Sequence, residues 1–282
     1  MAFAVNTTTL ANHLKTVYDS EFGLAPTEES VVAGYVSQPV GSQKIGNQLY
    51  LRHIAAVVAG KYSGTSGLPA NLSASTANTE DYKVTTLSYT YANLEVDEPA
   101  MTRIVDDGNF RTGLRKQMMN AVNAQIDTDL FTLAASLSHT QSVADLDDAT
   151  VRAALGDLAT YAKGKFRLGE TPVTMFIHPS EVQHALGVST FKEYQIRGIQ
   201  GAATTGQLNG FGITVKESGL VYTNAGNKYN ALILPEAWAL GWNIKPSFLA
   251  DQQDGIVTRF IVRAEYGVCE NWDELGVAVI TT

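Results

Sequence analysis

The most regular hydrophobic pattern in the chain lies between Phe110 and Leu137. Its apolar side chains recur at spacings of four residues, with a single spacing of three: Phe110, Leu114, Met118, Val122, Ile126, Leu130, Leu133 and Leu137. A stripe with this period predicts one amphipathic helix of about seven turns, roughly 40 Å long. The stripe is narrow, and the remaining helix positions are mostly polar.

The charged residues of this predicted helix are placed against its macrodipole. Arg111, Arg115 and Lys116 come early, and Asp127 and Asp129 come late. An isolated helix favours the opposite arrangement. We therefore expect these side chains to meet opposite charges elsewhere, including on another chain.

An alternating pattern upstream of the helix predicts one long hairpin over residues 47–97. Its arms are expected at Gln48–Val58 and Lys83–Val96, and the apolar phase of the second arm changes near Ala92–Asn93. Such a change predicts a bulge or a new packing partner. Between the arms, residues 60–81 are mainly Gly, Ser, Thr, Ala and Asn, which fits the tip of a projecting arm that neighbours order.

The other patterns predict short helices and several further strands. A helix over 147–164 has Asp147 or Asp148 as its cap and Gly164 at its end. Its expected buried face contains Val151, Ala154, Leu155, Leu158, Ala159 and Ala162. Further short helices are predicted at 6–20, at 99–105 and from His178 onward, and strands at 173–177, 211–217, 230–234, 244–249, 256–268 and 277–280. The predicted fold class is α+β with mostly antiparallel strands.

Composition then narrows the class of protein. Charged residues make up 17% of the 282 residues, hydrophobic residues make up 45%, and the net charge is −8, whereas soluble domains usually carry about 25% charged residues. No basic stripe is present to neutralise phosphates, which argues against sequence-specific DNA binding. No apolar run reaches the roughly 18 residues of a membrane span. The scarcity of charge indicates either that the surface is unusually poor in charge or that much of it is covered by something.

No recognised catalytic or ligand-binding motif emerges from the sequence. Gly60-Lys61 lacks the earlier glycine and the following Ser or Thr of a phosphate-binding loop. The five histidines are not spaced as metal ligands, and the single cysteine, Cys269, is expected to be inert. Asp145, Asp147 and Asp148 lack the glycine and distal glutamate of a calcium loop. We therefore predict no catalytic, cofactor or metal residues, while an enzyme whose site has no recognisable motif stays a weak alternative.

Three stretches resemble the major capsid proteins of tailed phages with the Hong Kong 97-like fold. They are residues 86–137, residues 206–218 (Gly-Gln-Leu-Asn-Gly-Phe-Gly-Ile-Thr-Val-Lys-Glu-Ser) and residues 257–280, which contain Val-Arg-Ala-Glu-Tyr-Gly. The order of the predicted parts is also similar: an N-terminal arm, an extended hairpin with a glycine-rich tip, a long spine helix, a mixed domain and a closing strand pair.

This resemblance implies an organisation and a function. It implies an N-terminal arm at 1–28, an extended-loop region at 29–98, a peripheral domain with the spine helix at 99–140 and 243–270, and an axial domain at 141–242 and 271–282. Such proteins assemble into an icosahedral shell of hexamers and pentamers that holds double-stranded DNA without sequence specificity. The implied location is the virion, assembled in a bacterial cytoplasm. The alternative is an encapsulin-like bacterial nanocompartment that binds protein cargo.

The resemblance also implies partners and interface residues. The main partner is the chain itself, and separate scaffolding, portal and decoration proteins are further candidates; no cofactor and no membrane are implied. Because the arm starts at Met1, we expect scaffolding to be a separate protein or unnecessary. Lys61 lies near the loop tip, but no asparagine stands in 256–268 to accept a covalent crosslink, so none is expected. The candidate interface residues are Lys61, Tyr62, Tyr89, Tyr91, Arg111, Arg115, Lys116, Asp127 and Asp129.

Overall fold

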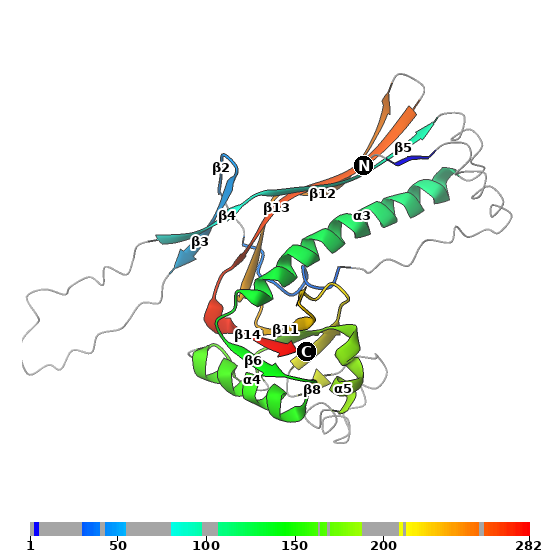
Figure 1. Ribbon diagram of the computed structural model, residues 1–282. Helices are drawn as coiled ribbons and strands as arrows, with labels where there is room; N and C mark the ends of the chain where they lie inside the picture. Colours follow the sequence, from blue (N-terminus) through cyan, green and yellow to red (C-terminus); the bar gives the residue numbers. More distant parts are fainter. Residues whose placement is uncertain are drawn as a thin grey trace, which may run out of the picture.

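The molecule consists of a compact part and an elongated part, which a pair of long strands connects. The compact part is a mixed sheet with short helices beside it, and the elongated part is a narrow sheet with one long helix along it (Figure 1). A hairpin projects from the junction (Figure 1). The computed structural model describes residues 3–5, 30–39, 43–54, 80–97, 107–162, 164–167, 170–187, 209–210, 213–253 and 257–282.

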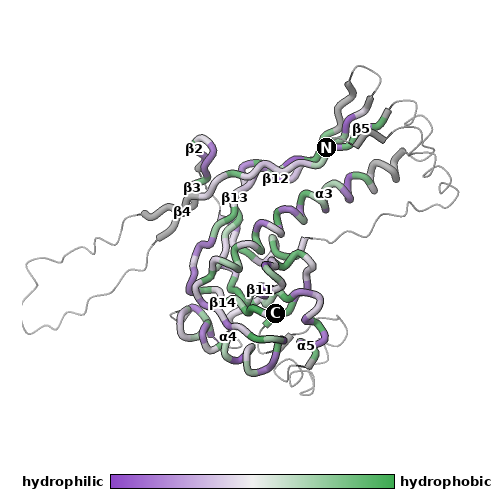
Figure 2. The backbone as a smooth tube through the Cα atoms, viewed as in Figure 1, coloured by the Kyte–Doolittle hydropathy of each residue, from purple (hydrophilic) through white to green (hydrophobic). Residues whose placement is uncertain are grey.

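The compact part is built on a sheet whose described strands run in the order β6-β14-β11-β7-β9-β8, with β10 beside β11. The β6/β14 and β7/β9 pairs are parallel and the other pairs are antiparallel. All five residues of β7 are buried, as a central strand covered on both faces requires. Hydrophobic stretches concentrate where β11 and β14 lie (Figure 2). The strands are β6 (Thr140–Val143), β7 (Val173–Ile177), β8 (Asn209–Gly210), β9 (Ile213–Glu217), β10 (Thr223–Asn224), β11 (Asn227–Ile233) and β14 (Gly276–Thr281).

Helix α4 (Asp148–Tyr161) confirms the predicted helix in this part of the chain. The Asp147 carboxylate accepts a hydrogen bond of 2.7 Å from the Thr150 N–H, so Asp147 is the cap. Gly164 has φ +83°, which suits its place just past the helix end. The prediction for Ala159 is wrong because the buried stripe passes through Leu158 and Ala162 and leaves Ala159 exposed. The segment after β7 continues into η3 (Pro179–Glu181) and α5 (Val182–Gly187).

The elongated part is a four-stranded sheet, hereafter the long sheet, in the order β1-β5-β13-β12. Its strands are β1 (Phe3–Val5), β5 (Ser88–Asp97), β12 (Trp238–Gln253) and β13 (Val257–Glu270). Strands β12 and β13 are longer than predicted and run from the compact part to the far end (Figure 1). Their pairing has two register shifts between Trp242 and Ser247, and Pro246 lies inside this irregular stretch. Proline is tolerated there because a bulge does not need its missing N–H.

Helix α3 (Asp107–Thr132) confirms the long predicted helix and lies along one face of the long sheet (Figure 1). The predicted stripe is its buried face, since Met118, Val122, Ile126 and Leu130 are all buried. From the sheet, every second residue of β13 is fully buried: Phe260, Val262, Ala264 and Tyr266. The helix then tightens into the 3-10 turn η2 (Leu133–Ala135), and the stripe ends at the buried Leu137.

The predicted hairpin is confirmed at its base but not along its whole second arm. Strand β3 (Gln48–Ile54) pairs with β4 (Glu80–Thr86), and β2 (Gln43–Ile45) pairs with the other edge of β3. The second arm changes partner at Leu87, after which β5 joins β13. The bulge expected near Ala92–Asn93 is wrong, because β5 pairs with β13 in an unbroken register. The predictions for 6–20, 99–105 and most of 60–81 lie outside the described residues.

A buried aspartate on α3 anchors the segment that leads into the hairpin. Asp127 is completely buried. Its carboxylate accepts hydrogen bonds from the N–H groups of Val31 (2.6 Å), Val32 (3.3 Å) and Ala33 (3.3 Å) and from the Ser30 hydroxyl (3.1 Å). Four donors at one carboxylate satisfy the desolvated charge and leave none of these donors unpaired.

Replacing this aspartate should destabilise the fold strongly. The substitution Asp127→Ala removes the acceptor of four partly or fully buried donors, so we expect a loss of about 2–4 kcal/mol in the free energy of unfolding. Denaturant titration of the full chain measures this value. The exposed acid Glu217 serves as the matched control, because Glu217→Ala should cost about 0.5 kcal/mol or less. An equal effect of the two substitutions would contradict the anchoring role.

The destabilisation caused by Asp127→Ala should also depend on pH. Burial outweighs the four hydrogen bonds and raises the pKa of Asp127 above the ordinary 3.8. A carboxyl whose pKa is raised by folding contributes its full stability below the unfolded pKa and loses part of it as pH rises through the folded pKa. The loss on substitution should therefore be larger at about pH 4 than at about pH 7, whereas the opposite slope would show that the hydrogen bonds dominate.

Candidate assembly surface

Within the described residues, polar clusters are small and serve local structure. No group of three or more His, Cys, Asp or Glu side chains there is arranged to hold a metal ion. His139 stacks on Tyr161 with ring centroids 3.6 Å apart, and His178 caps the turn at Ser180 through its Nδ1. His184 lies 3.7 Å from Asp145. Among the described residues, no helix is long and apolar enough to cross a membrane.

Two tyrosines stand out on the face of the long sheet that is turned away from α3, hereafter the outer face. Tyr89 is 54% exposed and Tyr91 is 58% exposed, and their ring centroids lie 6.1 Å apart. They lie opposite Glu265 and Arg263 of β13 in the strand register. Side chains two residues apart on one strand share a face, so the two rings form a continuous aromatic patch.

A further apolar side chain extends this patch. Leu249, 44% exposed, pairs with Ile261, which in turn pairs with Asn93 of β5, so it lies on the same face as the tyrosines. Ile45 is also exposed, at 59%, but it lies on β2 of the hairpin, on the face opposite to Lys44. Three of the six large hydrophobic side chains that are exposed in the described residues thus belong to the outer face. Clustered exposed apolar side chains are typical of a surface that another molecule covers.

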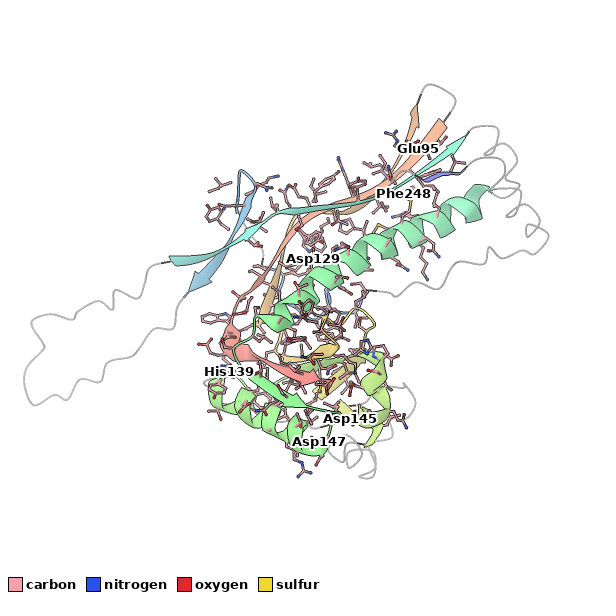
Figure 3. The ribbon with its side chains drawn as sticks, viewed as in Figure 1. Glu95, Asp129, His139, Asp145, Asp147 and Phe248 are labelled. Atoms are coloured by element: carbon pink, nitrogen blue, oxygen red, sulfur yellow. The ribbon has the colours of Figure 1, made fainter. Side chains whose placement is uncertain are left out.

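Most of the charges on this face are neutralised within the chain. At the far end, Arg259 donates two hydrogen bonds to the Glu95 carboxylate (Figure 3), the one from Nε at 2.7 Å. Near the junction, Lys44 pairs with Glu265 at 2.9 Å. Arg263 is exposed between them and forms no ion pair with another described residue. Exposed tyrosines with one arginine form the composition that interface centres favour.

The charged residues predicted from the long helix have different environments. Arg115 lies over the ring of Phe248, with its guanidinium carbon 6.0 Å from the ring centroid, and Lys116 is exposed. Asp129 accepts hydrogen bonds from Gln125 (3.0 Å) and from the Tyr266 hydroxyl (2.6 Å). Among the described residues, Asp127 and Asp129 thus meet neutral donors of their own chain and not opposite charges. Asp127, predicted as an interface residue, is completely buried within this chain and does not reach the surface of the single subunit.

The pair formed by Asp129 and Tyr266 joins α3 to the long sheet (Figure 3). Burial and the bond to Asp129 raise the pKa of the Tyr266 phenol well above its usual range. The phenol therefore stays protonated and donates to the carboxylate, which is a charge-assisted hydrogen bond.

The structure does not bring all predicted interface residues together. Tyr89 and Tyr91 share the outer face, whereas Arg115 and Lys116 lie on the helix at the other side of the sheet. Lys61, Tyr62 and the side chain of Arg111 lie outside the described residues. Sequence reasoning missed Ile45, Leu249 and Arg263, because only the register of β5, β13 and β12 brings the last two beside the tyrosines.

Solved structures share this architecture along almost the whole chain. A chain in the head structure of Helicobacter pylori bacteriophage KHP40 matches with a TM-score of 0.69 and 13% identity, over 93% of this chain and 94% of that one. The capsid of cyanophage P-SCSP1u matches with a TM-score of 0.66 and 11% identity, over 95% and 94%. The SrpI encapsulin of Synechococcus elongatus matches with a TM-score of 0.58 and 11% identity, over 95% and 94%.

These matches define the fold. The chain has the α+β fold of proteins that build shells. Within that class, it has the capsid fold of tailed phages that the sequence resemblance predicted. By sequence alone, the chain matches no family profile and no curated protein.

The outer-face tyrosines should contribute to self-association far more than to folding. Tyr89→Thr combined with Tyr91→Thr keeps residues that favour strands but removes both rings. We expect this double variant to weaken self-association about tenfold or more, with unfolding free energy changed by about 1 kcal/mol or less. Sedimentation velocity over a concentration series measures the association. Tyr161→Ala, a tyrosine exposed elsewhere, should leave it unchanged, and equal behaviour of the two variants would contradict the assignment.

Proposed function

We propose that this chain is the major capsid protein of a tailed phage, which assembles into a closed icosahedral shell of hexamers and pentamers around double-stranded DNA. The observation that carries the proposal is that the capsid fold extends over more than nine-tenths of the chain, with the counterparts covered to the same extent. A fold shared end to end leaves little of the chain for an additional domain with another activity.

The surface of the subunit supports the same function. A shell subunit must bury several faces against copies of itself, and such interfaces are depleted of charge at their centres. The low charge content of the chain and the aromatic outer face meet that requirement. The net charge of −8 also suits a container for DNA, because an acidic wall does not bind the packaged phosphates tightly.

The proposal assigns a structural role and no catalysis to the chain. Its implied place is the virion, after assembly in the cytoplasm of a bacterial host. Its first partner is the chain itself. Separate scaffolding, portal and decoration proteins would then be the partners that set the shell size, provide the DNA entrance and cover the exterior.

A nanocompartment shell is the second candidate, because the fold is also that of an encapsulin. Such a shell encloses protein cargo, and its subunits need no portal. The two candidates share the assembly step and differ in the contents of the particle, so they make the same prediction for the isolated protein and different predictions for particles from the native source.

Purified full-length protein should assemble into closed particles of uniform size, visible by negative-stain electron microscopy. Protein that stays monomeric at high concentration, with and without a crowding agent, would contradict both shell functions. Particles isolated from native cells should contain nuclease-protected double-stranded DNA if the chain is a capsid protein. Particles that contain one enzyme and no protected DNA would instead establish the nanocompartment.

A further inference from the structure

The projecting hairpin contacts the long sheet through Lys44, Leu49, Thr85 and Leu87, and this set of contacts is hereafter called the seam. A single residue, Leu87, connects β4 to β5, and its N–H donates to the Asn47 carbonyl at 3.0 Å. Leu49, Leu87 and Ala239 form a small buried cluster with Cys269 packed against it, separate from the main core. Among the side chains that the structure describes, this cluster is far smaller than the extended core under α3.

One end of the seam is a close contact between strands. The Thr85 hydroxyl of β4 donates to the Val268 carbonyl of β13 at 2.7 Å. A Cβ on Gly267 would lie 2.4 Å from Thr85 Cγ2, so only glycine allows β4 this close to β13. This contact fixes the separation of β4 and β13 close to Leu87, where the chain passes from the hairpin into the long sheet.

The other end of the seam is an ion pair. Lys44 Nζ of β2 lies 2.9 Å and 3.2 Å from the two carboxylate oxygens of Glu265 on β13. The side-chain amide of Asn243 on β12 donates to the same carboxylate. Hydrogen bonds from Lys44 and Asn243 hold the pKa of Glu265 below its usual range, so the carboxylate is ionised at neutral pH.

The two ends of the seam lie in one cross-strand row of the three-stranded sheet β2-β3-β4. Lys44 pairs with Leu49, and Leu49 pairs with Thr85, so the three side chains share a face across β2, β3 and β4. Two strand spacings separate the ion pair from the Thr85 contact by about 10 Å. Lys44 and Thr85 are therefore two separate points at which one face of this sheet contacts β13.

We propose that Lys44, Glu265 and Asn243 form a clamp that sets the angle of the hairpin against the long sheet, with the contact of Thr85 and Gly267 as its pivot. Lys44 and Glu265 are partly exposed, and an exposed ion pair shifts an equilibrium by about fivefold or less. Such a clamp biases the orientation of the hairpin without deciding whether the chain folds. The proposal concerns the single subunit and does not require a shell.

The accessibility of Cys269 can be used to measure whether the clamp is closed. Cys269 is the only cysteine and packs against the seam that tilting would open. The substitutions Lys44→Gln and Glu265→Gln should each increase the rate of Cys269 modification by a maleimide about threefold to fivefold. Lys245→Gln, which removes the same charge from an exposed position on β12, should leave the rate unchanged.

Two further measurements distinguish a clamp from a general loss of stability. The charge exchange Lys44→Glu with Glu265→Lys should restore the slow rate, because the pair forms again with its signs reversed. High salt should accelerate modification of the wild type toward the rate of the single variants and leave those variants nearly unchanged. Equal rates in wild type, Lys44→Gln and Glu265→Gln would overturn the clamp, as would a charge exchange no slower than the single variants. The assay uses unassembled subunits, so its failure is distinct from a failure to form shells.

Discussion

The packing of α3 against the long sheet is the contact on which both parts of the molecule depend. Its stripe meets the fully buried residues of β13, and its last turns enter the compact part, where Phe131 packs edge-to-face on Phe176 of β7 at 5.5 Å. Buried residues of both parts consequently belong to one continuous hydrophobic core. Since interiors are closely packed, the two parts cannot turn relative to each other without disrupting this core. Through this helix, the long sheet and the sheet of the compact part form one rigid unit.

The acidic residues near the end of α3 show how tertiary contacts override a local rule. A carboxylate at a helix C-terminus costs about 0.3–1 kcal/mol against the macrodipole. Asp127 and Asp129 instead hold the two segments that border the helix, Asp127 through residues 30–33 and Asp129 through Tyr266. Hydrogen bonds to a charged group contribute about 1.5–3 kcal/mol each, which offsets the unfavourable dipole. The unusual charge order therefore reflects contacts inside the subunit, which the sequence pattern alone could not distinguish from contacts between subunits.

Local periodicity predicted the elements whose stability comes from one apolar face. The stripe of α3, the buried strand β7 and the capped helix α4 could all be read from the sequence, because each repeats its pattern over several residues. The change of partner at Leu87 could not, since it depends on pairing with β13 some 170 residues away. The far end of β12 was missed because Asp251, Gln252 and Gln253 are polar and are held by backbone pairing. Alternation identified Tyr89 and Tyr91, but Leu249 and Arg263 join them only through the register of three strands.

The contrast between a rigid body and an adjustable hairpin has a consequence for assembly. A closed shell built from one sequence places that sequence in rings of different size, so some contact must change its angle while the subunit core stays fixed. The core under α3 is large and continuous, whereas the described contacts under the hairpin are one small cluster, the contact of Thr85 with Gly267 and one ion pair. Angular variation would therefore concentrate at the seam, where it costs least, and the aromatic outer face would remain a constant surface. In a shell, the exposed ion pair of Lys44 and Glu265 would then lie where the geometry has to vary.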